Sequence, residues 1–134
     1  MNILFIGSNP SKKNIDPNVP FKGTKSEYIL NAWIKVLEVQ NYTIINIFDK
    51  VTESNRPLSR REIKSCLVQL KRKLETIKYD KIIALGKSAS DALKILKVDH
   101  YKMYHPSPRN RMLNAKESLQ NELERCKVYL YDKK

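Results

Sequence analysis

The chain has 134 residues, a length that suits one domain covering positions 1–134. Its 26 basic and 14 acidic residues give a formal net charge of +12, which fits a polyanionic partner (nucleic acid first, an anionic membrane surface second) as well as it fits a lysine-rich surface that only confers solubility. Two histidines and two distant cysteines are too few for a structural zinc or an iron–sulfur centre, so we expect no metal and no cofactor.

The first third of the chain predicts a strand, a long loop and a helix. Residues 3–6 are a continuous apolar run closed by Gly7, as in a strand buried on both faces of a parallel sheet. The following segment, 11–25, is rich in proline, asparagine and glycine and predicts irregular structure. From residue 26 onward the apolar residues recur at helical spacing. The expected buried stripe of this helix consists of Ile29, Ala32, Trp33, Val36 and Leu37.

A second strand is predicted over residues 42–48, with one amide, Asn46, near its end. Ser59 and Glu62 have the spacing of a capping box and predict the start of a second helix. Nine basic and three acidic residues fall between positions 56 and 81, which predicts a basic face on this helix. Its apolar stripe is expected at Ile63, Cys66, Leu67, Leu70, Leu74 and Ile77.

The last part of the chain repeats the pattern twice. Residues 80–86 predict a third buried strand, and Ser88 with Asp91 predicts the start of a helix that buries Ala89, Ala92, Leu93 and Leu96. Residues 100–108 predict a short fourth strand broken by Pro106. Asn114 and Glu117 are expected to cap a final helix that runs through Cys126, and residues 127–134 are expected to be a tail with no assigned partner.

Four strands alternating with four helices predict an α/β fold: a three-layer α/β/α arrangement around a four-stranded parallel sheet. Ligands of such sheets bind beyond the carboxyl ends of the strands. This rule gathers the residues after Gly7, Asn46, Gly86 and the segment 105–109 on one edge.

The two cysteines and the amino-terminal segment carry further expectations. Cys66 and Cys126 lie among apolar residues at helical spacing, which favours core thiols over a disulfide. MNILFIG lacks the length and the basic lead-in of a signal sequence, and no apolar run approaches ~18 residues. We therefore expect a soluble, cytoplasmic protein that does not insert into membranes.

The edge residues exclude several kinds of active site. GSNPS, residues 7–11, is neither a P-loop nor a dinucleotide-binding glycine motif, and no nucleophile elbow of the GxSxG kind occurs. The nearest acids, Asp16 and Asp49, give little support for a catalytic carboxylate pair.

Four motifs in order carry a resemblance: GSNPS, then PFKGTKSEYIL, then NRPLSRREIKSCLVQL with KIIALGKSASDAL, and finally HPSPRNR. From residue 2 to about 123 the chain resembles the uracil-DNA glycosylase superfamily. Its middle motifs are most similar to the family-four branch, whereas the Gly-x-Asn-Pro of the first motif is similar to the mismatch-specific branch. Of the cluster-binding cysteines of family four only Cys66 has a counterpart, so the resemblance implies no iron–sulfur cluster.

The resemblance implies roles for the residues of the base pocket. Phe21 would stack on a flipped base, although a loop-packing staple is the alternative, and Asn46 would read the edge of the base. His105 would donate to the base O2 as a neutral imidazole. Asn9 would position the attacking water, with Ser8 beside it against the base. Ser11 stands where stringent uracil enzymes carry a bulky tyrosine, which predicts tolerance of some 5-substituted uracils.

The same resemblance assigns contacts to the DNA strand. Ser107 and Pro108 would grip backbone phosphates, and Arg109 and Arg111 lie in the loop that enters the minor groove. Arg109 could fill the vacated stack, hold a phosphate or remain solvated. Further contacts to DNA are expected from Arg56 and Lys87.

The sequence therefore predicts a monomeric, monofunctional DNA glycosylase that removes uracil or a related deaminated or 5-modified pyrimidine and leaves an abasic site. Two alternatives stay open: a non-catalytic or weakly active nucleic-acid-binding relative, because Asn9 is an amide where other branches carry an acid, and a nucleoside or nucleotide hydrolase on the same scaffold.

Overall fold

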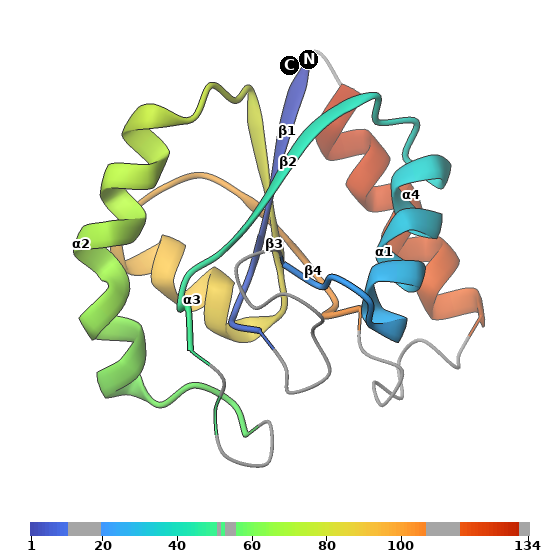
Figure 1. Cartoon of the computed structure of the whole chain (residues 1–134). Coiled ribbons are helices and arrows are strands. Elements are labelled where there is room, and N and C mark those ends of the chain that lie inside the picture. Colours follow the sequence, from blue (N-terminus) through green and yellow to red (C-terminus); the bar gives the residue numbers. More distant parts are fainter. Residues whose placement is uncertain (11–19, 51, 53–55, 107–115, 132–134) are drawn as a thin grey trace.

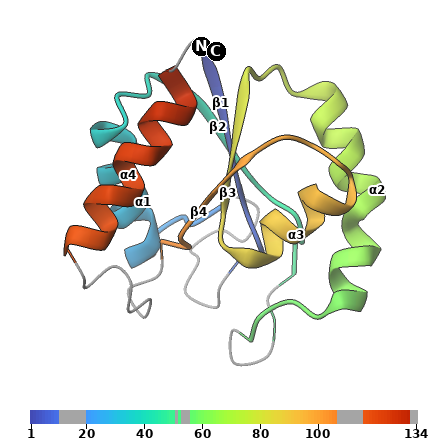
Figure 2. The ribbon, with the colours of Figure 1, turned by 180° about the vertical axis from the view of Figure 1, so that it is seen from behind.

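The computed structural model describes residues 1–10, 20–50, 52, 56–106 and 116–131. Its elements in chain order are β1 (Asn2–Gly7), α1 (Lys25–Val36), β2 (Asn41–Asn46), α2 (Arg60–Thr76), β3 (Lys81–Leu85), α3 (Lys87–Ile95), β4 (Tyr101–Met103) and α4 (Lys116–Tyr131). All strand pairs are parallel, in the order β2-β1-β3-β4. Helices α1 and α4 cover one face and α2 and α3 the other (Figures 1 and 2). The predicted three-layer α/β/α fold with a four-stranded parallel sheet is confirmed.

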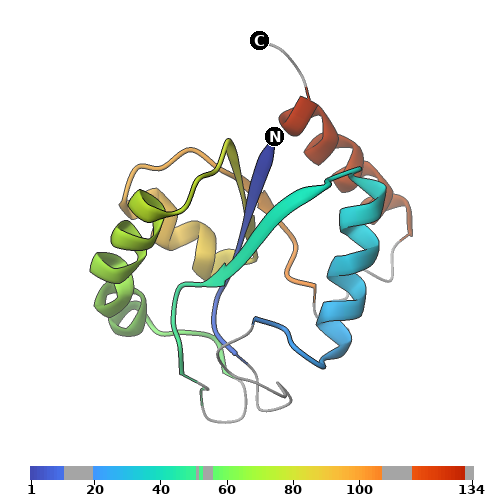
Figure 3. The ribbon, with the colours of Figure 1, turned by 45° about the horizontal axis from the view of Figure 1, so that its top comes forward.

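Alternating side chains of β1 build the two halves of the core. Ile3 and Phe5 belong to the apolar cluster with α1 and α4, and Leu4 and Ile6 belong to the cluster with α2 and α3. This division follows the two-residue period of a strand. Since both faces of the sheet are covered, the central strands β1 and β3 are apolar over residues 3–6 and 82–85. Strand β2 twists across β1, as expected for such a sheet (Figure 3).

The predicted capping box of α2 is confirmed, whereas the predicted start of α3 is wrong. The Ser59 hydroxyl accepts from the backbone N–H of Glu62 at 3.2 Å, and Glu62 Oε1 accepts from the N–H of Ser59 at 2.8 Å. Helix α3 begins at Lys87, because the chain leaving β3 already turns at Gly86, whose φ of 95° favours glycine. Asp91 consequently pairs with Lys87 rather than serving a cap at Ser88.

The buried face of α1 differs from the prediction. In α1, Ala32 and Val36 are exposed, because the buried face is formed by Leu30, Trp33, Ile34 and Leu37. This set has the same i, i+3, i+4, i+7 spacing, rotated around the helix axis.

The expected carboxyl-terminal tail is helical as far as Tyr131. Leu130 is only 2% exposed, since it continues the apolar spacing of Leu123 and Cys126 against the sheet. The Tyr131 hydroxyl donates to the carbonyl of Leu37 at 2.6 Å, which fastens the end of α4 to the end of α1. The expected cap at Asn114 lies outside the described residues.

Both cysteines are free and buried, which confirms the prediction of core thiols. Burial raises the pKa of the Cys126 thiol to about 12 and also raises the pKa of Cys66, so both stay protonated at neutral pH. Within the described ranges, none of the helices has the length and apolar character needed to cross a bilayer. The same residues contain no group of three or more His, Cys, Asp or Glu side chains able to hold a metal ion.

Candidate functional site

The carboxyl ends of the strands meet at the lower edge of the sheet in Figure 1. Gly7, the last residue of β1, is the register partner of Asn46, the last residue of β2. The pairing extends past both strands, because the N–H of Ile47 donates to the Gly7 carbonyl at 3.0 Å and that of Phe48 donates to the Ser8 carbonyl at 2.9 Å. The first residues of the two following loops are therefore fixed side by side.

The Asn46 side chain is buried without satisfying its acceptor. Asn46 is 9% exposed, and its Oδ1 is the one buried side-chain oxygen or nitrogen of the described residues without a hydrogen-bond partner. Leaving such a group unpaired costs about 1–3 kcal/mol. The oxygen lies only 2.7 Å from the position that a Cβ on Gly7 would occupy. A glycine is therefore required for the amide to lie against β1.

Phe21 approaches the same side of Gly7 as Asn46 does. Its ring edge comes within 3.1 Å of the same Cβ position, and the side chain is also part of the apolar cluster under α1. Its φ of 64° is unusual for a residue with a side chain. The Phe21 carbonyl accepts from the N–H and the hydroxyl of Thr24, at 3.0 and 2.7 Å, and Thr24 is the N-cap of α1. The start of α1 thus holds Phe21 in place.

His105 follows β4 and completes this group. Its ring centroid lies 5.9 Å from that of Phe21, at an interplanar angle of 57°. A Cβ on Gly86 would lie 3.1 Å from the Cβ of His105, so the glycine after β3 allows the histidine to approach the sheet. Burial lowers the pKa of His105, which keeps the imidazole neutral with one ring N–H to donate. Asn46 and Phe21 therefore lie against Gly7, and His105 lies against Gly86 beside Phe21, while their roles in binding a base stay predictions.

Asn9 is oriented by two hydrogen bonds. Its Nδ2 donates to the carbonyl of Lys50 at 3.0 Å, and its Oδ1 accepts from the hydroxyl of Ser8 at 3.1 Å. The described contacts of Asn9 thus run to the loop after β2 and not to Phe21 or His105. An amide oxygen has two lone pairs, so Oδ1 keeps one for a further donor such as a water molecule.

The two described cations assigned to DNA each pair with a carboxylate. Arg56 donates to both carboxylate oxygens of Glu62, at 2.6 and 3.1 Å, and its hydrogen bond is the largest of the causes that lower the pKa of Glu62 to about 2. Lys87 contacts Asp91 at 2.6 Å, and its side chain is 79% exposed. Both cations lie near the edge that carries the site, and their contact with DNA stays a prediction.

Several predicted residues lie outside the described residues, and their roles stay predictions. They are Ser11 of the first loop and Ser107, Pro108, Arg109 and Arg111 of the last loop.

Three supporting groups were not foreseen from the sequence: the Lys50 carbonyl, the Thr24 cap and Lys73. The Lys73 ammonium donates to the Asn46 carbonyl at 3.4 Å, which brings a positive charge to the end of β2. Thr24 followed by Glu27 had the spacing of a helix start and could have been identified. A backbone acceptor such as the Lys50 carbonyl leaves no trace in the sequence.

The geometry agrees with a comparison of the sequence with known families. The family model described as Uracil DNA glycosylase superfamily matches residues 1–127, which include every strand and the motifs at the strand ends. No curated protein sequence matches the chain. With nearly the whole length matched and the described motif residues gathered on one edge of the sheet, the chain belongs to the uracil DNA glycosylase superfamily.

Proposed function

We propose that the protein is a DNA glycosylase that hydrolyses the N-glycosidic bond of uracil, or of a related deaminated or 5-modified pyrimidine, in DNA. The observation that carries the proposal is the buried, unpartnered Oδ1 of Asn46 beside Gly7. A fold that leaves an acceptor unpaired at the ligand-binding edge of its sheet gains from a ligand that donates there. The N3–H of a flipped uracil is such a donor, and the amide N–H of Asn46 can serve the uracil O4.

Phe21 and His105 would hold the base with its edge toward Asn46. Flipping a base costs a few kcal/mol of stacking and pairing, and an aromatic face recovers part of that cost. Phe21 and His105 lie 5.9 Å apart and flank the two glycines that leave room at the strand ends. In this proposal the base lies against the Phe21 ring with its O2 toward His105.

The chemistry consists of breaking C1′–N1 and adding water to the sugar. The bonding electrons leave with the base, so negative charge grows on its O2 and is stabilised by a neutral donor that is already in place. His105 supplies that donor, since burial lowers its pKa. A water held by Asn9 Oδ1 adds to C1′ and releases its proton to solvent, while the departed base anion takes up a proton from solvent. The products are the neutral free base and an abasic site.

The amide of Asn9 limits the rate in this scheme. Because an amide neither accepts a proton as a base nor carries charge, Asn9 can only position the water. Its fixed orientation, with Nδ2 on the Lys50 carbonyl, leaves Oδ1 as the end available to water. The small Ser11 extends the proposal to 5-substituted uracils, and a panel of modified bases tests that extension.

The decisive experiment measures excision from a labelled uracil-containing strand by alkaline cleavage of abasic sites. The wild-type protein is expected to give product, and Asn46→Ala to lower the single-turnover rate by about 10²–10³. Asn41→Ala is the matched control, because Asn41 is an exposed amide at the opposite end of the same strand. Equal rates for the two variants would contradict the role of Asn46, and absence of product with the wild-type protein would contradict the glycosylase.

A second candidate, a binding protein without turnover, is favoured by one observation. Each end of the Asn9 amide already has a protein partner, since Ser8 donates to Oδ1 and Nδ2 donates to Lys50, so only the second lone pair of Oδ1 remains for a water molecule. Tight, salt-dependent binding of uracil-containing DNA with no abasic product would support this candidate. Release of base from free nucleosides instead of DNA would identify a nucleoside hydrolase.

A further inference from the structure

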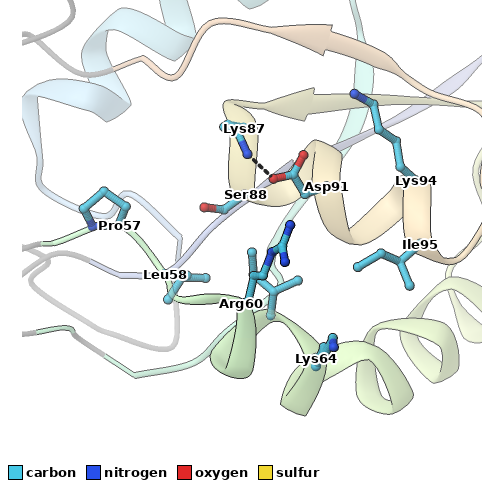
Figure 4. A pocket seen from close by; sticks show the side chains of 10 residues that line it. Pro57, Leu58, Arg60, Lys64, Lys87, Ser88, Asp91, Lys94 and Ile95 are labelled. Carbon is cyan, nitrogen blue, oxygen red and sulfur yellow. Dashed lines mark hydrogen bonds and ion pairs between the residues drawn. The ribbon is translucent and has the colours of Figure 1, made fainter.

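A groove of about 700 Å³ lies between α2 and α3, on the face of the sheet opposite α1 and α4 (Figure 4). It begins at the segment before α2 and follows α3 to its last residue. Asn46, Phe21 and His105 are not among its lining residues. The groove is lined by Pro57, Leu58, Arg60, Ile63, Lys64, Lys87, Ser88, Asp91, Lys94 and Ile95.

The floor of the groove is aliphatic. Leu58 and Ile63 belong to the buried core beneath the groove, and Ile95, at the end of α3, lines the same groove with 52% of its surface exposed. A single exposed isoleucine is ordinary on a helix surface, so Ile95 bears on docking only because it lines the same groove as Leu58 and Ile63. The floor therefore provides a place for one or two aliphatic side chains of a partner.

The rim of the groove is positively charged. Arg60 and Lys64 come from α2, and Lys87 and Lys94 come from α3 (Figure 4). Among the described lining residues Asp91 is the one acid, and its carboxylate pairs with Lys87 at 2.6 Å. The groove thus combines an aliphatic floor with an excess of cations on both walls.

The aliphatic floor and basic rim together favour an acidic peptide over a nucleic acid as the partner of the groove. Grooves for single-stranded nucleic acid combine basic side chains with aromatic ones on which bases stack, and the lining contains no aromatic residue. A duplex backbone would contact the rim and leave the floor unfilled. A second copy of the chain would add another charge of +12, which opposes association. An acidic peptide with aliphatic anchors complements both floor and rim.

We infer that the groove between α2 and α3 docks an acidic, aliphatic segment of a partner protein, with the aliphatic side chains on Leu58, Ile63 and Ile95 and the carboxylates on the cations of the rim. The inference does not depend on the proposed glycosylase, because no residue of the base pocket takes part. Its test measures binding alone and can succeed or fail whatever the excision assay gives.

The probe is a fluorescent helical peptide of about 15 residues with leucine on one face and glutamate on the others. Binding is followed by anisotropy and by amide NMR shifts of the full chain. The expected result is saturable binding that shifts the resonances of Leu58, Ile63 and Ile95. Ile95→Glu is expected to weaken it by about tenfold or more.

Matched variants separate docking from general charge attraction. Val68→Glu makes the same change at an aliphatic position of α2 that is 64% exposed and outside the groove, and it should weaken binding much less. Lys94→Glu should likewise exceed Lys71→Glu, whose lysine is exposed on α2 beyond the lining. Equal losses in each pair, or no saturable binding, would overturn the inference. A thymidine oligonucleotide of similar length that displaces the peptide and shifts the same floor resonances would overturn it in favour of a nucleic-acid path.

Discussion

The protein contains two buried polar groups that differ in hydrogen bonding: the Ser90–His100 pair is satisfied, and Asn46 is not. Away from the strand-end site, the fully buried Ser90 hydroxyl lies 2.8 Å from His100 Nε2, and His100 Nδ1 lies 2.8 Å from the carbonyl of Val98. With Nδ1 donating to that carbonyl, Nε2 accepts from Ser90, so each polar atom has a partner. At the strand ends, Asn46 Oδ1 has none among the described residues.

This difference separates a structural histidine, His100, from His105, which lies beside the strand-end group. The Ser90–His100 pair resembles a catalytic dyad by residue type, yet a serine with no exposed surface cannot reach a substrate. It fastens α3 to the segment before β4. The fold supplies no hydrogen-bond donor to Asn46 Oδ1 among the described residues. An acceptor left unpaired in this way is available to a ligand. Mutations should therefore affect activity at one group and stability at the other.

The largest expected effect comes from Gly7→Ala. Its Cβ would lie 2.7 Å from Asn46 Oδ1 and 3.1 Å from the Phe21 ring, so both side chains must move. Misplacement of positioning groups by about 1 Å can cost 10²-fold in rate, and we expect a loss of at least about this size in single-turnover excision. The unfolding free energy should also fall, by about 1–3 kcal/mol, because the Phe21 ring belongs to the core cluster, so excision is compared per folded molecule. A fully active Gly7→Ala protein would break the assignment of the site.

The second prediction concerns the structural pair. Ser90→Ala leaves the acceptor of His100 without its donor and should destabilise the protein by about 1–3 kcal/mol in urea unfolding. Excision per folded molecule should stay unchanged. Ser65→Ala is the control, because the Ser65 hydroxyl donates to the Glu62 carbonyl on the exposed face of α2. A loss of activity without a loss of stability in Ser90→Ala would reverse the contrast between the two groups.

The sequence predicted the fold because each element carries its own signal. The apolar run at residues 3–6 reflects a strand covered on both faces, and Ser59 with Glu62 specifies the start of α2. The prediction of buried residues was wrong where the local pattern allows more than one buried helix face. In α1, the sets that begin at Ile29 and at Leu30 both have helical spacing, and only the position of α4 and the sheet decides between them.

The site could be predicted less completely than the fold. Asn46 and His105 could be proposed as site residues because Asn46 stands near the end of a predicted strand and His105 opens the HPSPRNR motif. The contact of Asn46 with Gly7 depends on strand register, and the hold of Lys50 on Asn9 joins residues 41 positions apart. Single-chain patterns contain no information about such pairings. The groove between α2 and α3 could not be predicted for the same reason, since its walls come from two helices that are separate in the sequence.

The third prediction tests the support of Phe21. Thr24→Ala removes the N-cap of α1 and the hydroxyl that holds the Phe21 carbonyl, and should cost about 1 kcal/mol of stability. Because the strained φ of Phe21 then has less support, excision should also slow by several-fold. Thr24→Ser keeps the hydroxyl and should restore both. Loss of stability with unchanged excision would show that Phe21 only packs the loop.

The smallest expected effect is a pH dependence at His105. Burial lowers its pKa below the ordinary value of 6.5, so in the window between the two values the unfolded chain binds a proton that the folded protein does not. Stability therefore falls as the pH drops through that window, and the stability that His105 contributes as a neutral group is fully present only above it. His105→Gln removes this component, so the unfolding free energies of wild type and variant should converge or cross as the pH falls below about 6.5. Parallel pH curves would mean that His105 is solvated like an ordinary histidine, and its role as a neutral donor to the base would then lose its physical basis.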